Sequence, residues 1–187
     1  MTTANKITIA RILLAPFFVA ELILYLQRGY EPHRLAALGL FLLIAIGDGV
    51  DGFVARRFNQ KTQMGALLDP IADKLLLVFS LIILSLHNQP YLDPIPIWLT
   101  ITVLLRDVVL LLFLVLVTFL VGHGEVRPHL LGKGATVLQM TCVVWTMAKL
   151  PSEPLPYLAA AATALTAASG IIYVRNGLRM LRAPKPS

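Results

Sequence analysis

Four aspartates stand close together in the sequence, in a pattern that could bind metal ions. Asp48 and Asp51 are three residues apart, and Asp69 and Asp73 are four apart. On a helix both spacings place two side chains on one face, so two antiparallel helices could aim four carboxylates at one point. Oxygen-only clusters suit Mg²⁺ or Mn²⁺, and two such ions would balance the charge and clamp a diphosphate. The alternative is a structural ion-pair network between helices.

Small residues flank both aspartate pairs. Gly52 and Ala55 follow the first pair, and Gly65 lies one helical turn before the second. Small side chains let two helices approach closely, as helices that share one carboxylate site must do. The pattern therefore predicts a site at a tight contact between neighbouring helices.

The segments that carry these residues are strongly apolar. Of 187 residues, 57% are hydrophobic and 14% are charged, and the mean hydropathy is +0.77. The apolar residues fall in runs of about 20, the length that crosses a bilayer as a helix. The sequence therefore predicts an all-α, polytopic membrane protein with a single domain over 1–187. Six transmembrane helices are expected near 7–26, 35–54, 66–86, 95–121, 131–150 and 155–174.

The basic residues predict the orientation of these helices. The net charge is +6, from 16 basic and 10 acidic residues. Basic loops face the cytosol and attract anionic lipid headgroups. One side of the predicted spans carries Lys6, Arg56, Arg57, Lys61, Arg127, Lys133, Arg175, Arg179, Arg182 and Lys185, against Arg28, Arg34 and Lys149 on the other. Both termini and the aspartates are therefore expected on the cytosolic side of a bacterial-type plasma membrane. No soluble basic face remains to bind nucleic acid, so none is expected as a partner.

The aspartates belong to a longer motif. The chain reads Asp48-x2-Asp51-Gly52-x2-Ala55-Arg56-x8-Gly65-x3-Asp69-x3-Asp73. This run resembles the signature of the CDP-alcohol phosphatidyltransferase family, with all eight fixed positions filled. The six-span layout also resembles that family. The opening Asn5-Lys6-Ile7-Thr8-x2-Arg11 is similar to the start of its bacterial phosphatidylglycerolphosphate synthases.

The resemblance implies an enzyme of phospholipid biosynthesis that moves a phosphatidyl group from CDP-diacylglycerol to an alcohol and releases CMP. It implies that Asp48, Asp51 and Asp69 bind two divalent ions, Mg²⁺ or Mn²⁺, and that Asp73 is a shared ligand or the general base. Residues implied to contact the CDP donor are Thr8, Arg11, Gly52, Ala55, Arg56 and Gly65. The family also implies a homodimer in contact with membrane lipids.

Three basic residues in the second half of the chain are candidates for binding the acceptor. Arg106 lies within the fourth predicted span, Lys133 opens the fifth, and Arg175 follows the sixth. In related enzymes, basic residues in such places are suited to holding an acceptor phosphate. Arg106 could instead pair with Asp107, and Lys133 and Arg175 could be positive-inside anchors.

The resemblance favours glycerol 3-phosphate as the acceptor, as in a phosphatidylglycerolphosphate synthase. One departure favours an alternative, since the related enzymes carry a further Arg several residues after the position of Arg106, and 108–116 here has no charge. The run around Arg106-Asp107-Val108 is also similar to the cardiolipin synthases of the same family, whose acceptor is phosphatidylglycerol. A membrane transporter is the remaining alternative, although it would be expected to distribute polar residues along a path.

Overall fold

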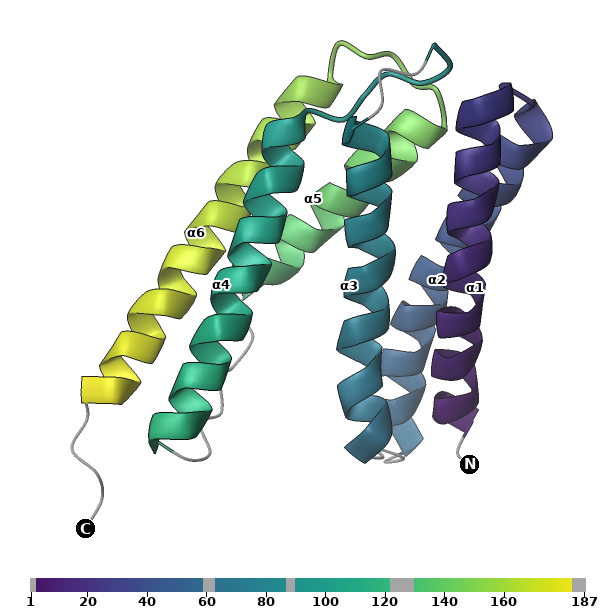
Figure 1. The fold of residues 1–187 in the computed structure, drawn as a ribbon. Coiled ribbons are helices and arrows are strands. Elements are labelled where there is room, and N and C mark those ends of the chain that lie inside the picture. The colour runs from purple at the N-terminus through teal and green to yellow at the C-terminus, as the bar shows by residue number, and fades with distance from the viewer. Residues whose placement is uncertain (1–2, 59–62, 87–89, 122–129, 183–187) are drawn as a thin grey trace. The chain divides into compact units, whose positions relative to one another are not determined.

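A computed structural model describes residues 3–58, 63–86, 90–121 and 130–182 (Figure 1). Within these ranges the surroundings of side chains are described for 13–47, 74–86, 90–113, 115, 131–176 and 178. All statements about side chains below refer to these residues.

The described residues form six helices and no strand, which confirms the predicted all-α class. The helices are α1 Thr3–Arg28, α2 Glu31–Phe58, α3 Gln63–Leu86, α4 Ile97–Val121, α5 Leu130–Met147 and α6 Leu155–Arg182. Each coincides with one predicted apolar segment. α6 continues eight residues beyond the predicted end at 174, because the polar residues that follow do not break a helix and the next proline is Pro184.

One helical segment of the described chain, Leu155–Asn176, is long and apolar enough to cross a membrane, with a mean hydropathy of 1.6. The apolar part of α3, Lys74–Leu86, is shorter than a spanning helix. By length and composition, the described residues thus support a membrane-spanning α6. The arrangement of six spans stays a prediction.

The helices divide into two compact units. The first unit holds 1–94 and 144–150, with a buried core that includes Phe18, Tyr25 and Phe41. The ring centroids of Phe18 and Phe41 are 5.7 Å apart, and this contact joins α1 to α2. These apolar contacts hold α2, which carries Asp48 and Asp51, against α1.

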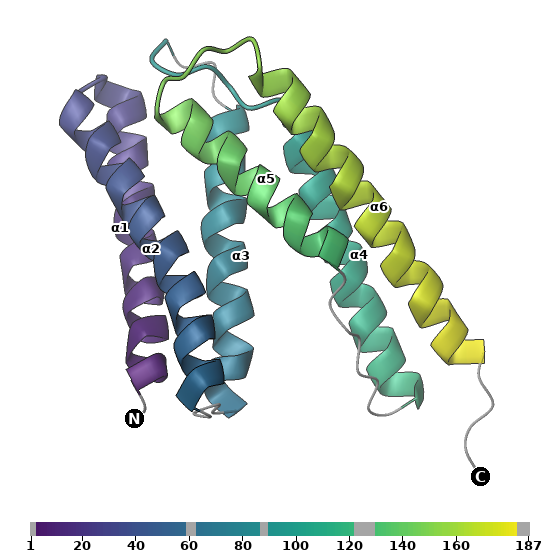
Figure 2. The same cartoon turned by 180° about the vertical axis from the view of Figure 1, so that it is seen from behind.

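The second unit holds 95–143 and 151–187. In it α4 and α6 pack side by side, and the start of α5 lies obliquely to them (Figures 1 and 2). Ala159 and Ala162 of α6 are fully buried, and their small side chains allow close helix packing. Gln139 of α5 donates a hydrogen bond to the Thr166 hydroxyl of α6 at 2.7 Å, which aligns these two helices.

The end of α5 is set by a backbone motif that the apolar pattern does not reveal. Lys149 has a positive φ of 54°. Its N–H donates to the Thr146 carbonyl at 3.1 Å, and the Leu150 N–H donates to the Trp145 carbonyl at 3.2 Å. This pair of bonds is the Schellman motif, which terminates a helix. α5 therefore ends at Met147, three residues before the predicted limit of 150.

Lys149 also joins a cluster of polar side chains in the first unit. Its Nζ donates to Glu31 Oε1 at 2.5 Å, and Arg34 Nε donates to Glu31 Oε2 at 2.6 Å. Arg34 Nη1 also donates to the Met147 carbonyl at 2.7 Å and so satisfies one of the last carbonyls of α5. A second pair, His33 Nδ1 and Glu21 Oε2 at 2.7 Å, provides Glu21 with a partner on α2.

Glu31→Gln tests this cluster through its pH dependence. Hydrogen bonds from Lys149, and then from Arg34, lower the pKa of Glu31 from 4.5 to about 2. Because this pKa is depressed, the stabilisation is fully present above pH 4.5 and is lost as the pH falls through about 2. We expect the variant in detergent to unfold at a lower temperature than the wild type at pH 7. The two unfolding temperatures should converge near pH 2, and a constant difference would contradict the assignment.

Gly29→Ala is expected to destabilise the turn between α1 and α2. Gly29 has a φ of 67°, and its N–H donates to the Tyr25 carbonyl at 2.7 Å. A Cβ here would both strain the backbone and clash with the ring of Tyr91. We expect a loss of about 1–3 kcal/mol, measured as a lower midpoint of thermal unfolding.

The matched control is Gly39→Ala within α2, where a Cβ would meet nothing within 4 Å. Because alanine favours helix over glycine, this variant should unfold at the same temperature as the wild type or higher. Equal destabilisation by both substitutions would contradict the role of the Tyr91 contact.

Candidate functional site

The backbone places the four aspartates on two helices of the first unit. Asp48 and Asp51 lie in α2, and Asp69 and Asp73 lie in α3. The chain is helical through both pairs, so the members of each pair are separated by about one turn. Four carboxylates on two helices of one unit form a donor set whose chemistry fits hard divalent cations. The side chains of all four lie outside the described residues.

The residues predicted to contact the donor lie on α1, α2 and α3, and the last two of these helices also carry the aspartates. Thr8 and Arg11 are in α1, Gly52, Ala55 and Arg56 are in α2, and Gly65 is in α3. These six side chains also lie outside the described residues. Among the side chains that are described, no group of three or more His, Cys, Asp or Glu residues could hold a metal ion.

Arg106 is the predicted acceptor residue whose surroundings are most fully described. It leaves α4 with a side chain only 13% exposed. A Cβ built on Gly170 of α6 would lie 3.4 Å from Arg106 Cγ, and one built on Gly132 of α5 would lie 3.1 Å from Arg106 Nη2. The side chain therefore runs past the backbone of α6 and ends beside the backbone of α5.

The guanidinium of Arg106 is buried but only weakly paired. Arg106 Nη1 lies 3.6 Å from Asp107 Oδ1, beyond hydrogen-bonding distance. Arg106 Nε is buried and has no hydrogen-bond partner within the described part of the chain. A buried cation with an unused donor is costly unless an anion completes it. The unused Nε donor therefore marks Arg106 as a candidate for binding an anionic group.

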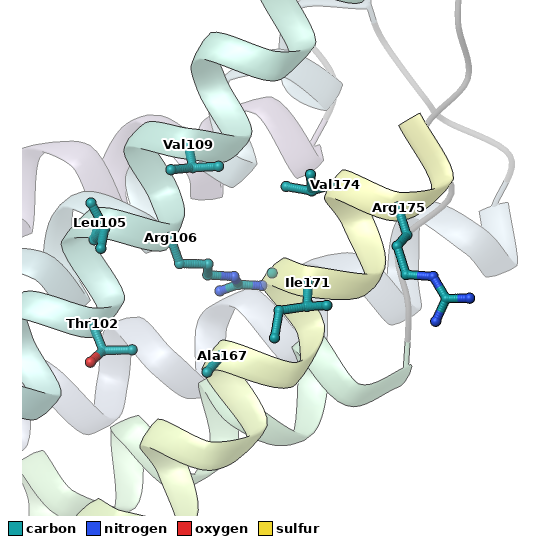
Figure 3. Close-up of a pocket in the computed structure, with 9 residues that line it drawn as sticks. Thr102, Leu105, Arg106, Val109, Ala167, Ile171, Val174 and Arg175 are labelled. Atoms are coloured by element: carbon teal, nitrogen blue, oxygen red, sulfur yellow. The ribbon is translucent and has the colours of Figure 1, made fainter. Parts of the chain in front are cut away.

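A cavity of about 400 Å³ lies beside Arg106, between α4 and α6 (Figure 3). Its walls are mostly aliphatic, with one hydroxyl and two guanidinium groups. The lining residues are Thr102, Leu105, Arg106, Val109, Ala167, Gly170, Ile171, Val174 and Arg175. The Thr102 hydroxyl donates back to the Trp98 carbonyl at 2.8 Å. The surface that faces the cavity is almost entirely apolar, so Arg106 and Arg175 line it mainly with their carbon atoms.

The three predicted acceptor residues are not equally placed. Figure 3 shows Arg106 reaching from α4 toward α6, whereas Arg175 points away from it. Lys133 follows Gly132 directly in the first turns of α5 and is exposed. The structure thus brings Arg106 close to the start of α5, and Arg175 contributes to the cavity wall without facing the Arg106 guanidinium.

The sequence did not indicate that Gly132 and Gly170 pack against Arg106. Nor did it indicate that Gln139 pairs with Thr166. Both arrangements join residues of different helices that are far apart in the chain. The only local signal was the presence of glycine and glutamine inside apolar helices, where each needs a packing or hydrogen-bonding reason.

Comparison with known proteins is consistent with the motif. The family model for CDP-alcohol phosphatidyltransferase matches residues 1–172. The CDP-diacylglycerol--glycerol-3-phosphate 3-phosphatidyltransferase of Escherichia coli (strain K12) is 33% identical over 144 residues, which cover 75% of this chain and 74% of the relative. The proteins of the same name from Shigella flexneri serotype 5b (strain 8401) and Shigella sonnei (strain Ss046) match to the same extent.

Proposed function

Since the chain belongs to the CDP-alcohol phosphatidyltransferase family, we propose that it transfers a phosphatidyl group from CDP-diacylglycerol to glycerol 3-phosphate. The products are phosphatidylglycerolphosphate and CMP, and the reaction is a step of phospholipid biosynthesis. The names of the relatives state both substrates. These relatives cover about three quarters of the chain, including the aspartate motif and the start of α5.

The observation that carries the acceptor assignment is the buried, weakly paired guanidinium of Arg106. Arginine binds phosphate through two parallel hydrogen bonds, and such bonds are strongest where water is excluded. Within the described residues, Arg106 Nε has no hydrogen-bond partner, and the Asp107 carboxylate lies 3.6 Å from Nη1. The phosphate of glycerol 3-phosphate would supply the missing acceptors. Lys133, next to Gly132, would add a second positive charge, and Arg175 would add a third from the rim of the cavity.

The aspartates would perform the chemistry at the donor. Asp48, Asp51, Asp69 and Asp73 would hold two divalent ions, Mg²⁺ or Mn²⁺, which when bound would neutralise the charge of the diphosphate. Asp73 would take the proton from the acceptor hydroxyl as its oxygen attacks the phosphorus attached to diacylglycerol. The bond from that phosphorus to the CMP oxygen breaks, and CMP leaves. Because phosphoryl-type transfer depends mainly on positioning, the chain's task is to hold the two substrates in line.

The remaining donor contacts follow from the family motif. Gly52, Ala55 and Gly65 would admit the cytidine diphosphate close to the backbone of α2 and α3. Arg56 would contact a phosphate or the base, and Thr8 and Arg11 would approach the donor from α1. The acyl chains of the donor would stay in the bilayer while its nucleotide lies in water.

The proposal includes the arrangement of the protein in the membrane. All six helices would cross the bilayer, with both termini and the aspartates on the cytosolic side, where nucleotide-activated substrates are found. The excess of basic residues at that end of the predicted spans supports this orientation. The chain would function as a homodimer in contact with membrane lipids, as a single catalytic domain.

One observation favours phosphatidylglycerol as a second candidate acceptor. The cavity beside Arg106 has aliphatic walls, and its single hydroxyl, that of Thr102, is already bonded to its own helix. A glycerol moiety would find few partners there, whereas an acyl chain would bury apolar surface. The uncharged run 108–116 also favours phosphatidylglycerol as the acceptor. In that case the chain would be a cardiolipin synthase.

An acceptor panel tests the proposal. Purified protein in liposomes would receive CDP-diacylglycerol and Mg²⁺, and CMP release would be measured with glycerol 3-phosphate, phosphatidylglycerol, inositol phosphate or serine. We expect CMP release with glycerol 3-phosphate alone. Release with phosphatidylglycerol alone would establish the second candidate. No CMP release with any acceptor, from protein shown to be folded, would contradict the proposed transferase activity and favour the membrane transporter.

A further inference from the structure

Arg106 is held between two glycines from different helices. Gly170 of α6 lies against the aliphatic stem, since a Cβ there would be 3.4 Å from Arg106 Cγ. Gly132 of α5 lies against the guanidinium, since a Cβ there would be 3.1 Å from Nη2. Gly170 lies well inside α6, where glycine costs about 1 kcal/mol relative to alanine, and Gly132 is the third residue of α5. The close approach of Arg106 gives a reason for a glycine at each position.

The contacts of the guanidinium distinguish its two sides. Nη1 is directed to Asp107. Nε, on the other side, is buried without a hydrogen-bond partner within the described residues. Nε and Nη2 share one edge of the planar group, and two oxygens of a phosphate can bind such an edge in parallel. Gly132 lies next to Nη2, at the end of this edge.

A Cβ added at Gly132 would lie 3.1 Å from Arg106 Nη2, close to the distance at which an acceptor oxygen would bind. An acceptor oxygen bound to Nη2 would lie about 2.7–2.9 Å from it. A methyl group at 3.1 Å would crowd the same nitrogen, so it would either displace the guanidinium or compete with the oxygen. Two other glycines show no such relation. A Cβ added at Gly134, also in α5, would make an ordinary contact of 3.6 Å with Leu165 Cδ1, and one added at Gly39 would meet nothing within 4 Å.

We propose that Gly132 and Gly170 are positioning residues that hold the Nε–Nη2 edge of Arg106 in place to bind two oxygens of the acceptor's phosphate. Gly170 sets the path of the stem, and Gly132 lets the guanidinium lie close to the backbone of α5. This inference rests on the proposed role of Arg106 in binding the acceptor. The specificity for a phosphate group would then depend on Gly132 and Gly170, which have no side chain to donate a hydrogen bond.

The test compares glycine-to-alanine substitutions in the full-length protein. Gly132→Ala should raise the KM for glycerol 3-phosphate about tenfold, the loss expected for one charge-assisted hydrogen bond. Gly170→Ala should raise it less, because its contact is longer and falls on the stem. The KM for CDP-diacylglycerol should stay the same in both. Gly134→Ala is the matched control on α5 and should leave both KM values unchanged. Equal effects of Gly132→Ala and Gly134→Ala would overturn the inference.

A double variant separates positioning from general damage to the fold. Lysine lacks the Nη2 group, so in an Arg106→Lys background Gly132→Ala should cause little further rise in the acceptor KM. A purely structural effect of Gly132→Ala would instead add in full to that of Arg106→Lys. Additive effects would therefore contradict the proposal.

A binding measurement keeps this test independent of turnover. Inorganic phosphate should raise the thermal unfolding midpoint of the wild type and of Gly134→Ala, because a ligand stabilises the folded state that binds it. The shift should be reduced in Gly132→Ala. If the wild type releases no CMP with glycerol 3-phosphate, the proposed acceptor is wrong, but the phosphate shifts still test the glycines. Equal shifts in all three proteins, or none in the wild type, would overturn the inference.

Discussion

Asp73→Asn is expected to lower kcat by about 10²–10⁴-fold, the contribution of a positioned general base. Asparagine has nearly the same shape as aspartate but cannot take a proton from the acceptor hydroxyl. It is also a neutral and weaker ligand for a divalent ion. The measurement is CMP release from CDP-diacylglycerol with glycerol 3-phosphate at saturating Mg²⁺, in protein whose membrane insertion and yield match the wild type.

Asp93→Asn is the matched control for this variant. Asp93 lies between α3 and α4, is exposed, and is absent from the aspartate motif. The same chemical change there should leave kcat within about twofold of the wild type, as for most surface substitutions. Full activity of Asp73→Asn would show that another group takes the proton. Recovery of the variant at much higher Mg²⁺ would instead indicate that Asp73 is a metal ligand and not the base.

The helices could be predicted from the sequence because the signal is local. A run of about 20 apolar residues predicts a helix with little help from the rest of the chain, and each of the six runs became one helix. The boundaries were less accurate where they depend on distant groups. α5 ends at Met147 in a motif that places Lys149 at a positive φ, and Lys149 is bonded to Glu31 in a segment 118 residues away. No local pattern contains that contact.

The donor half and the acceptor half of the candidate site also differ in how far local sequence predicts them. The aspartate motif has fixed spacing within a short stretch, so the sequence alone could indicate its chemistry. The acceptor half depends on three helices. The sequence offered Arg106, Lys133 and Arg175 as candidate cations, each with a structural alternative. The structure leaves the Arg106 side chain only 13% exposed and turns Arg175 away from it. Burial and direction are set by tertiary packing, which spacing does not encode.

Glu21 shows how a tertiary contact resolves an ambiguous residue. It is an acid inside an apolar run, where local spacing names no partner. The structure pairs its Oε2 with His33 Nδ1 of the next helix at 2.7 Å. The pair joins α1 to α2 in the unit that carries the aspartates.

Arg106→Gln is expected to raise the KM for glycerol 3-phosphate by about 10–100-fold, because charge-assisted hydrogen bonds contribute about 1.5–3 kcal/mol. Arg106→Lys keeps the charge but loses the two-pronged donor, so its KM should lie between those of the wild type and Arg106→Gln. The KM for CDP-diacylglycerol should not change in either variant. Initial rates of CMP release at varied concentrations of each substrate measure both quantities.

The competing explanation is that Arg106 serves only as the structural partner of Asp107. Removing one member of a buried pair takes one compensating charge from the other, and neutralising both relieves that cost. Arg106→Gln combined with Asp107→Asn should therefore recover the thermal stability that Arg106→Gln loses. If Arg106 binds the acceptor, the double variant regains its unfolding temperature but keeps the raised KM. If the KM returns to the wild-type value together with the stability, Arg106→Gln acted only through the fold. The guanidinium would then be a structural element, and the acceptor phosphate would bind elsewhere.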